Sequence, residues 1–171
     1  VLMGRNAGGA IIDGSNNIVL GVGAGDAITD GTYNVLLGGN NCGGAIIGGS
    51  YNVGMGGSAL EQITTGDHNV AVGNNSLTNN TTGSSNTGIG SLALQANISG
   101  SFNTAISNGA LYLNTTGSNN VAVGYDAGDV ITTGSNNVVI GYGADPSANS
   151  GANQIVIGKG ATGQADNSVV L

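Results

Sequence analysis

The chain repeats itself about every 17 residues, and this period constrains its fold more than any other feature. Repeats begin at residues 1, 18, 35, 53, 70, 87, 104, 121, 138 and 155. The third repeat has 18 residues, with the extra one near Cys42, and the tenth has 14 before Val169 opens another. We therefore treat 1–171 as a single repetitive segment. Because it opens and closes inside the same apolar motif, we expect it to be a fragment of a longer chain.

Each repeat opens with a run of three residues, and glycine or, once, Ser107 follows. The third residue of the run is large and apolar, and the middle one is small or apolar. Successive residues of a strand point to opposite faces, so the run predicts a short strand that is apolar on both faces. A second apolar patch, such as Val130 and Ile131, and a second turn predict another strand. One repeat is then one coil, and the chain is predicted to be all-β: a parallel β-solenoid of about ten coils.

The doubly apolar strand also predicts self-association, because a lone solenoid buries only the inner face of its strands. We expect the middle position of the run to face a second or third copy of the chain. The predicted trimer-facing residues are Val19, Leu36, Ala71, Ala105, Ala122, Val139 and Val156. On this interpretation, Ala122→Asp breaks the trimer and leaves the interior of the coil untouched.

An asparagine closes most repeats, and these asparagines are predicted to stack into a ladder along one edge. The alternative is that asparagine only tolerates a left-handed turn there. The positions concerned are Asn17, Asn34, Asn52, Asn69, Asn86, Asn103, Asn120 and Asn137.

Composition excludes several classes of partner. Nine acidic residues against two basic ones, Arg5 and Lys159, give a net charge of −7. Nucleic acid and anionic membrane surfaces both require a basic footprint that this chain lacks. No apolar run is long enough to cross a membrane, so no membrane insertion is expected.

No constellation of side chains suggests an enzyme, a cofactor or a metal centre. Asp13 and Asp30 are the one acidic pair aligned on neighbouring repeats, and we expect both to be solvated. His68 is the sole histidine and lies in a polar turn. The segment 21–26 loosely resembles the glycine-aspartate pattern of calcium-binding β-rolls, but it occurs once and in a 17-residue period.

Two surface rows suggest other kinds of binding. Paired threonines, such as Thr64 with Thr65, recur in one slot and raise the alternative of an ice-binding solenoid. Aromatic residues occupy two further slots and are candidates for stacking on sugar rings, or else they cover the turn backbone. The candidate glycan-stacking residues are Tyr125 and Tyr142, just after the turn glycine, and Tyr33, Tyr51 and Phe102, just before the closing asparagine.

The repeats at 103–120 and 119–137 resemble those of phage-type tail-fibre proteins. The segment 153–171 is similar to the head repeat of trimeric autotransporter (YadA-like) adhesins, which form a β-roll. The resemblance implies a homotrimeric rod that spaces or presents a host-attachment element, located on a virion or extracellularly. A bacterial surface adhesin or a self-assembling extracellular filament of the same fold is the alternative. The implied partners are the chain itself and a host-surface glycan or protein receptor.

Overall fold

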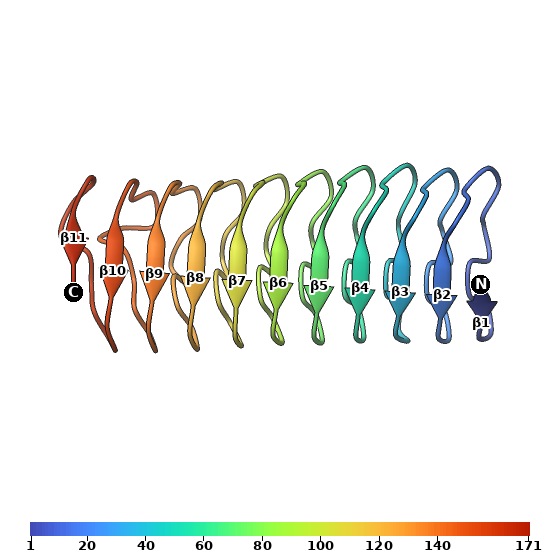
Figure 1. Ribbon diagram of the computed structural model, residues 1–171, viewed down its shortest axis with the longest axis horizontal. Coiled ribbons are helices and arrows are strands. Elements are labelled where there is room, and N and C mark those ends of the chain that lie inside the picture. The colour runs from blue at the N-terminus through green and yellow to red at the C-terminus, as the bar shows by residue number, and fades with distance from the viewer.

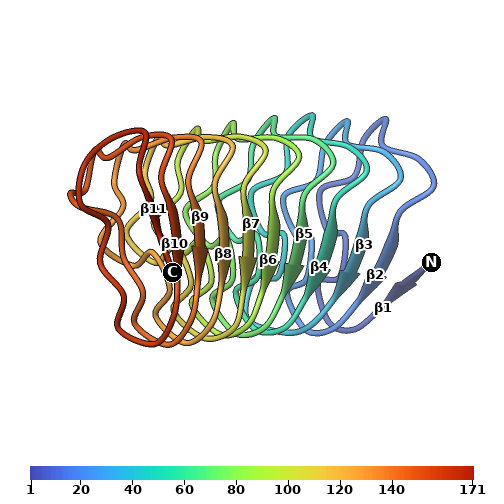
Figure 2. The same cartoon turned by 60° about the vertical axis from the view of Figure 1, so that its left-hand side comes forward.

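The computed structural model describes residues 1–171, and its regular structure consists of strands alone. Eleven strands form one sheet in which each pairs in parallel with the next along the chain (Figure 1). The strands are β1 (Leu2–Met3), β2 (Ile18–Leu20), β3 (Val35–Leu37), β4 (Val53–Met55), β5 (Val70–Val72), β6 (Thr87–Ile89), β7 (Thr104–Ile106), β8 (Val121–Val123), β9 (Val138–Ile140), β10 (Ile155–Ile157) and β11 (Val169–Val170). Turned by 60°, the coils superimpose into a tube with the strands along one wall (Figure 2). The predicted parallel β-solenoid is confirmed.

Corresponding positions of successive repeats lie side by side throughout the sheet. Val19 pairs with Leu36, and Leu36 with Gly54, although the repeat between the last two is one residue longer. The extra residue is absorbed before Cys42, where Asn40 and Asn41 both adopt left-handed conformations (φ 49° and 61°). The insertion is thus confined to a turn, which preserves the register of the sheet.

The prediction of a second strand in each coil is wrong. Two left-handed residues two positions apart, such as Asn75 and Leu77 (φ 55° and 51°), interrupt an extended chain there. The backbone still bonds from coil to coil: the amide of Thr64 donates to the carbonyl of Thr81. Of 108 backbone hydrogen bonds, 19 lie within the strands; most of the other 89, which involve turn or loop residues, also join neighbouring coils.

The core is a continuous column of 22 buried apolar residues inside the tube. Two core positions face each other within a coil, and the one that carries the large side chain differs between coils three and four. Leu36 on β3 faces Gly43, whereas Gly54 on β4 is followed by Leu60 in the same position of the next coil. A Cβ added at Gly43 would lie 2.5 Å from Leu36 Cδ1. Coils one to seven each hold one larger residue at this place and a glycine or alanine opposite it, whereas coil eight has Ala122 and Gly128. Close packing does not admit two large residues.

The predicted asparagine ladder is confirmed, and its side chains are buried. The Asn52 backbone amide donates to Asn34 Oδ1 at 2.9 Å, and the Asn52 side-chain amide donates to the carbonyl of Gly66 at 2.9 Å. The same pattern holds from Asn17 to Asn137, and Gln154 extends it with its backbone amide. Each rung joins its own coil to both neighbours, so the ladder fixes the stacking register.

Candidate functional site

The middle residues of the strands do not face outward, which corrects the predicted trimer-facing set. Val19, Leu36, Ala71, Ala105, Ala122, Val139 and Val156 all have no exposed surface and belong to the core of the single chain. A partner chain therefore cannot reach them. Ala122→Asp would place an unpaired charge inside the coil, where the carboxylate has no partner to offset its desolvation.

The first and third residues of each strand form the outer face of the sheet. They are partly exposed along its whole length; Ile18, Met55 and Ile89, for example, are 40–41% exposed. On β2–β10 the first row consists of Ile18, Val35, Val53, Val70, Thr87, Thr104, Val121, Val138 and Ile155, and the third row of Leu20, Leu37, Met55, Val72, Ile89, Ile106, Val123, Ile140 and Ile157. No side chain in either row is charged, and all but Thr87 and Thr104 are apolar, so the two rows together make an apolar stripe.

One group of candidate aromatics stacks face to face along the turn before the closing asparagine. The Tyr33 and Tyr51 ring centroids are 5.0 Å apart with planes 2° from parallel. His68, which the sequence did not connect with this row, stacks on Tyr51 at 5.0 Å. Neighbouring rings cover each other's faces, which leaves no space for a sugar ring between them. Phe102 stands apart in this row and is 63% exposed.

Tyr125 and Tyr142 form a second stack, with ring centroids 5.3 Å apart and planes 12° from parallel. Lys159 Nζ lies 5.8 Å from the centroid of the Tyr142 ring. Because Tyr142 covers one face of Tyr125, a single face of Tyr125 stays available. The two tyrosines that share this slot on consecutive coils thus stack on each other, with one ring face of Tyr125 accessible.

A second ladder of buried asparagines runs inside coils five to seven and was not predicted. Asn97 Nδ2 donates to Asn80 Oδ1 at 2.7 Å, and Asn114 Nδ2 donates to Asn97 Oδ1 at 2.8 Å. Coils on either side have Ile63 and Ile131 in this position. In the sequence these asparagines appear only as glycosylation sequons, yet all three are fully buried and serve the packing of the coils.

No three His, Cys, Asp or Glu side chains come together as a metal-binding group, although Asp129 lies close enough to Asp145 to affect its pKa. Asp13 and Asp30 are exposed. Burial, followed by the negative charge of Asp129, raises the pKa of Asp145 to about 6. Burial also raises the pKa of the Cys42 thiol to about 11, which leaves the thiol protonated and unreactive.

The threonine row is engaged within the solenoid. Thr64 Oγ1 donates to the carbonyl of Thr81 at 3.0 Å, and Thr115 Oγ1 donates to the carbonyl of Thr132 at 2.9 Å. In each pair the first hydroxyl thus bonds the next coil, and the regular surface of free threonines that an ice lattice would require is reduced to one interrupted row.

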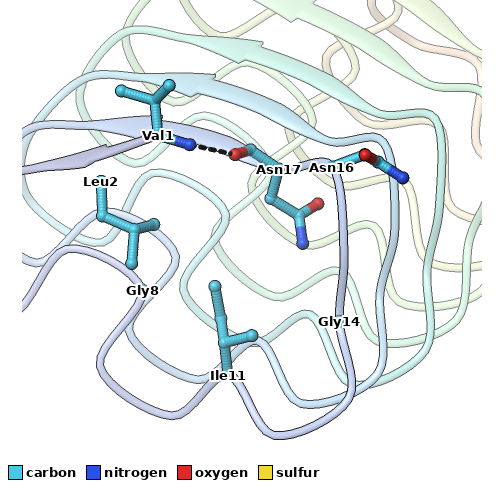
Figure 3. Close-up of a pocket in the computed structure, with 7 residues that line it drawn as sticks. All are labelled: Val1, Leu2, Gly8, Ile11, Gly14, Asn16 and Asn17. Carbon is cyan, nitrogen blue, oxygen red and sulfur yellow. Dashed lines mark hydrogen bonds between the residues drawn. The ribbon is translucent and has the colours of Figure 1, made fainter.

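The largest hollow, about 390 Å³, lies at the first coil (Figure 3). Leu2 and Ile11 point into it, and the amino group of Val1 donates to the carbonyl of Asn17 at 2.8 Å. Its apolar lining consists of positions that a neighbouring coil covers elsewhere in the stack. The hollow is therefore the end face of the solenoid, where Asn16 and Asn17 are the polar side chains of the lining.

Comparison with protein-family models, curated proteins and solved structures finds no match for this chain. No helix in the structure has the length and apolar character needed to cross a membrane.

Proposed function

We propose that this chain is a structural segment of a homotrimeric fibre, in a viral tail fibre or a similar appendage, that spaces or presents a receptor-binding element. The observation that carries the proposal is the apolar stripe on the outer face of the sheet. It is an interaction surface in a chain whose other candidate sites offer no catalytic arrangement.

The size of the stripe fits a stable interface. If each of its 18 side chains offers roughly 50 Å², the stripe covers roughly 900 Å², well above the largest apolar patch of a typical monomer. A standard protein–protein interface takes about 800 Å² from each partner. Covering the stripe removes this surface from water, a favourable change of roughly 25 cal/mol per Å² before the costs of association.

The partner that fits this stripe best is another copy of the chain. Its side chains repeat once per coil, at the strand spacing of about 4.8 Å. A second solenoid of the same chain carries the same spacing, so every coil can meet an equivalent coil. An arrangement of three copies around one axis turns all three stripes inward, and the net charge of −7 per chain favours solubility of the rod.

The test is the solution mass of the chain and of outward-facing charge variants, by light scattering and native mass spectrometry. We expect the wild type to be a trimer, and the double variant Ile106→Asp/Val123→Asp to be monomeric with an unchanged circular dichroism spectrum. Thr116→Asp is the matched control, because this exposed threonine lies in a turn outside the stripe, and it should remain trimeric. A wild-type chain that stays monomeric at tens of micromolar would refute the proposal.

A further inference from the structure

The second hollow of the structure, about 280 Å³, is built by coils six to eight and is not part of the apolar stripe. Its lining includes the side chains of Asn108, Tyr112, Tyr125, Asp126 and Asp129. Its volume is near the lower limit of small-molecule sites. The lining combines aromatic surface with an amide and two carboxylates, and the end-face hollow at the first coil has no such combination.

The aromatic wall is held in place from behind. Tyr142 covers one face of Tyr125, but it belongs to the next coil and is not part of the lining. All the residues that line the hollow belong to coils six to eight. The free face of Tyr125 is therefore the one turned to the hollow. With Lys159 beside Tyr142, the platform is a stack of three side chains that restricts rotation of the Tyr125 ring.

The polar lining supplies hydrogen-bond acceptors that point to a ligand with many hydroxyl groups. Asp126 is held in a left-handed turn conformation with φ 50°. Partial burial, followed by repulsion from Asp126, raises the pKa of Asp129. A partly desolvated carboxylate gains from hydroxyl donors, since hydrogen bonds to a charged acceptor are stronger than neutral ones. Two carboxylates with no basic residue in the lining also disfavour an anionic ligand.

From this combination we infer that the hollow between Tyr112 and Tyr125 binds a neutral or amino-bearing saccharide, with the sugar ring against the Tyr125 face and its hydroxyls on Asp126, Asp129 and Asn108. The C–H groups of a pyranose carry the partial positive charge that an aromatic face attracts. Acidic sugars are rejected by the two carboxylates. The inference goes beyond the proposed fibre role and does not rest on self-association.

The test is saturation-transfer NMR and titration of the intact chain with methyl β-glucoside, methyl β-galactoside, N-acetylglucosamine and methyl β-glucuronide. We expect at least one of the three uncharged sugars to bind with a Kd of about 1 mM, a weak affinity suited to a single small hollow. Tyr125→Ala should weaken it at least about tenfold, which corresponds to 1.4 kcal/mol. Tyr33→Ala is the matched control, because Tyr33 stacks on Tyr51 far from the hollow, and it should bind as the wild type does.

Several outcomes would overturn the inference. They are binding of none of the uncharged sugars, equal binding of the glucuronide, an equal loss in the Tyr33→Ala control, and binding of choline in place of any sugar. The last outcome would identify a site for organic cations. Light scattering on Tyr125→Ala separates the two proposals, because loss of sugar binding at unchanged mass concerns the hollow alone.

Discussion

The buried ladder of Asn80, Asn97 and Asn114 allows a sharp comparison between an inner rung and an end rung. Asn97→Val removes two bonds between rungs, and so it deprives Asn80 Oδ1 of its one partner and Asn114 Nδ2 of one of its two. The carbonyl of Gly100, which also accepts from Asn97, keeps its bond from Asn86. Each buried polar group left unpaired costs about 1–3 kcal/mol, so the loss is about 2–6 kcal/mol.

Burial of the valine side chain offsets about 1.5–3 kcal/mol of that loss. From the middle of the two ranges, we therefore expect Asn97→Val to lower the free energy of unfolding by about 2 kcal/mol. The end rung behaves differently, because Asn114 Oδ1 is buried without any hydrogen-bond partner. Asn114→Val leaves Asn97 Oδ1 without a donor, but it also removes the unpaired Asn114 Oδ1. The number of buried unpaired oxygens is therefore unchanged, and the two effects on stability cancel. The variant then keeps the gain from apolar burial beside Ile131, and its stability should equal or exceed that of the wild type.

The assay is guanidinium denaturation followed by circular dichroism, with the two variants and the wild type at the same protein concentration because self-association contributes to stability. Both substitutions have identical chemistry, so they differ only in the position of the rung. If Asn97→Val proves at least as stable as Asn114→Val, the argument from unpaired polar groups is refuted. Equal m-values are needed for the comparison, since a changed m-value would indicate a changed unfolding unit.

Three further predictions follow from single sites. Gly43→Leu should prevent normal folding, because Gly43 has φ +64° and a Cβ there meets Leu36. The double variant Leu36→Gly/Gly43→Leu copies the arrangement of the next coil and should recover much of the lost stability. Thermal unfolding of both variants measures this, and a double variant as unstable as Gly43→Leu would contradict it. The Cys42 thiol, with its pKa raised to about 11 by burial, should react with a thiol reagent only in denaturant; rapid labelling of the native chain would contradict it. Because the folded-state pKa of Asp145 is raised to about 6 from 3.8, the folded chain binds more protons than the unfolded chain between those values, so stability should fall as pH rises from about 4 to about 6. Denaturation midpoints at pH 4 and pH 7 should show this decrease, and Asp145→Asn should reduce it; an unchanged decrease in that variant would assign it to other groups.

The sequence pattern predicts the strands, but it does not show which face of each strand points into the tube. The apolar run predicted a strand correctly, but both faces of that strand carry apolar residues. Alternation therefore contains no information about which face is inside, and the prediction that Ala122 faces outward is wrong because its side chain is fully buried. Only the closed tube decides this, because the middle positions point toward the opposite turns.

The repeat pattern is enough to predict the coil. Its 17-residue period, the glycine after nearly every strand and the closing asparagine are local features that repeat. They specify a parallel stack whose register is fixed by the Asn34–Asn52 rung and its equivalents. Features that depend on side-chain direction across coils can be read only from the folded stack. Left-handed residues such as Leu77 turn the second apolar patch inward without a strand. They also bring Asn80 beneath Asn97, and the hollow beside Tyr125 draws on three coils at once. No single repeat contains these arrangements, because each arises only when neighbouring coils are stacked.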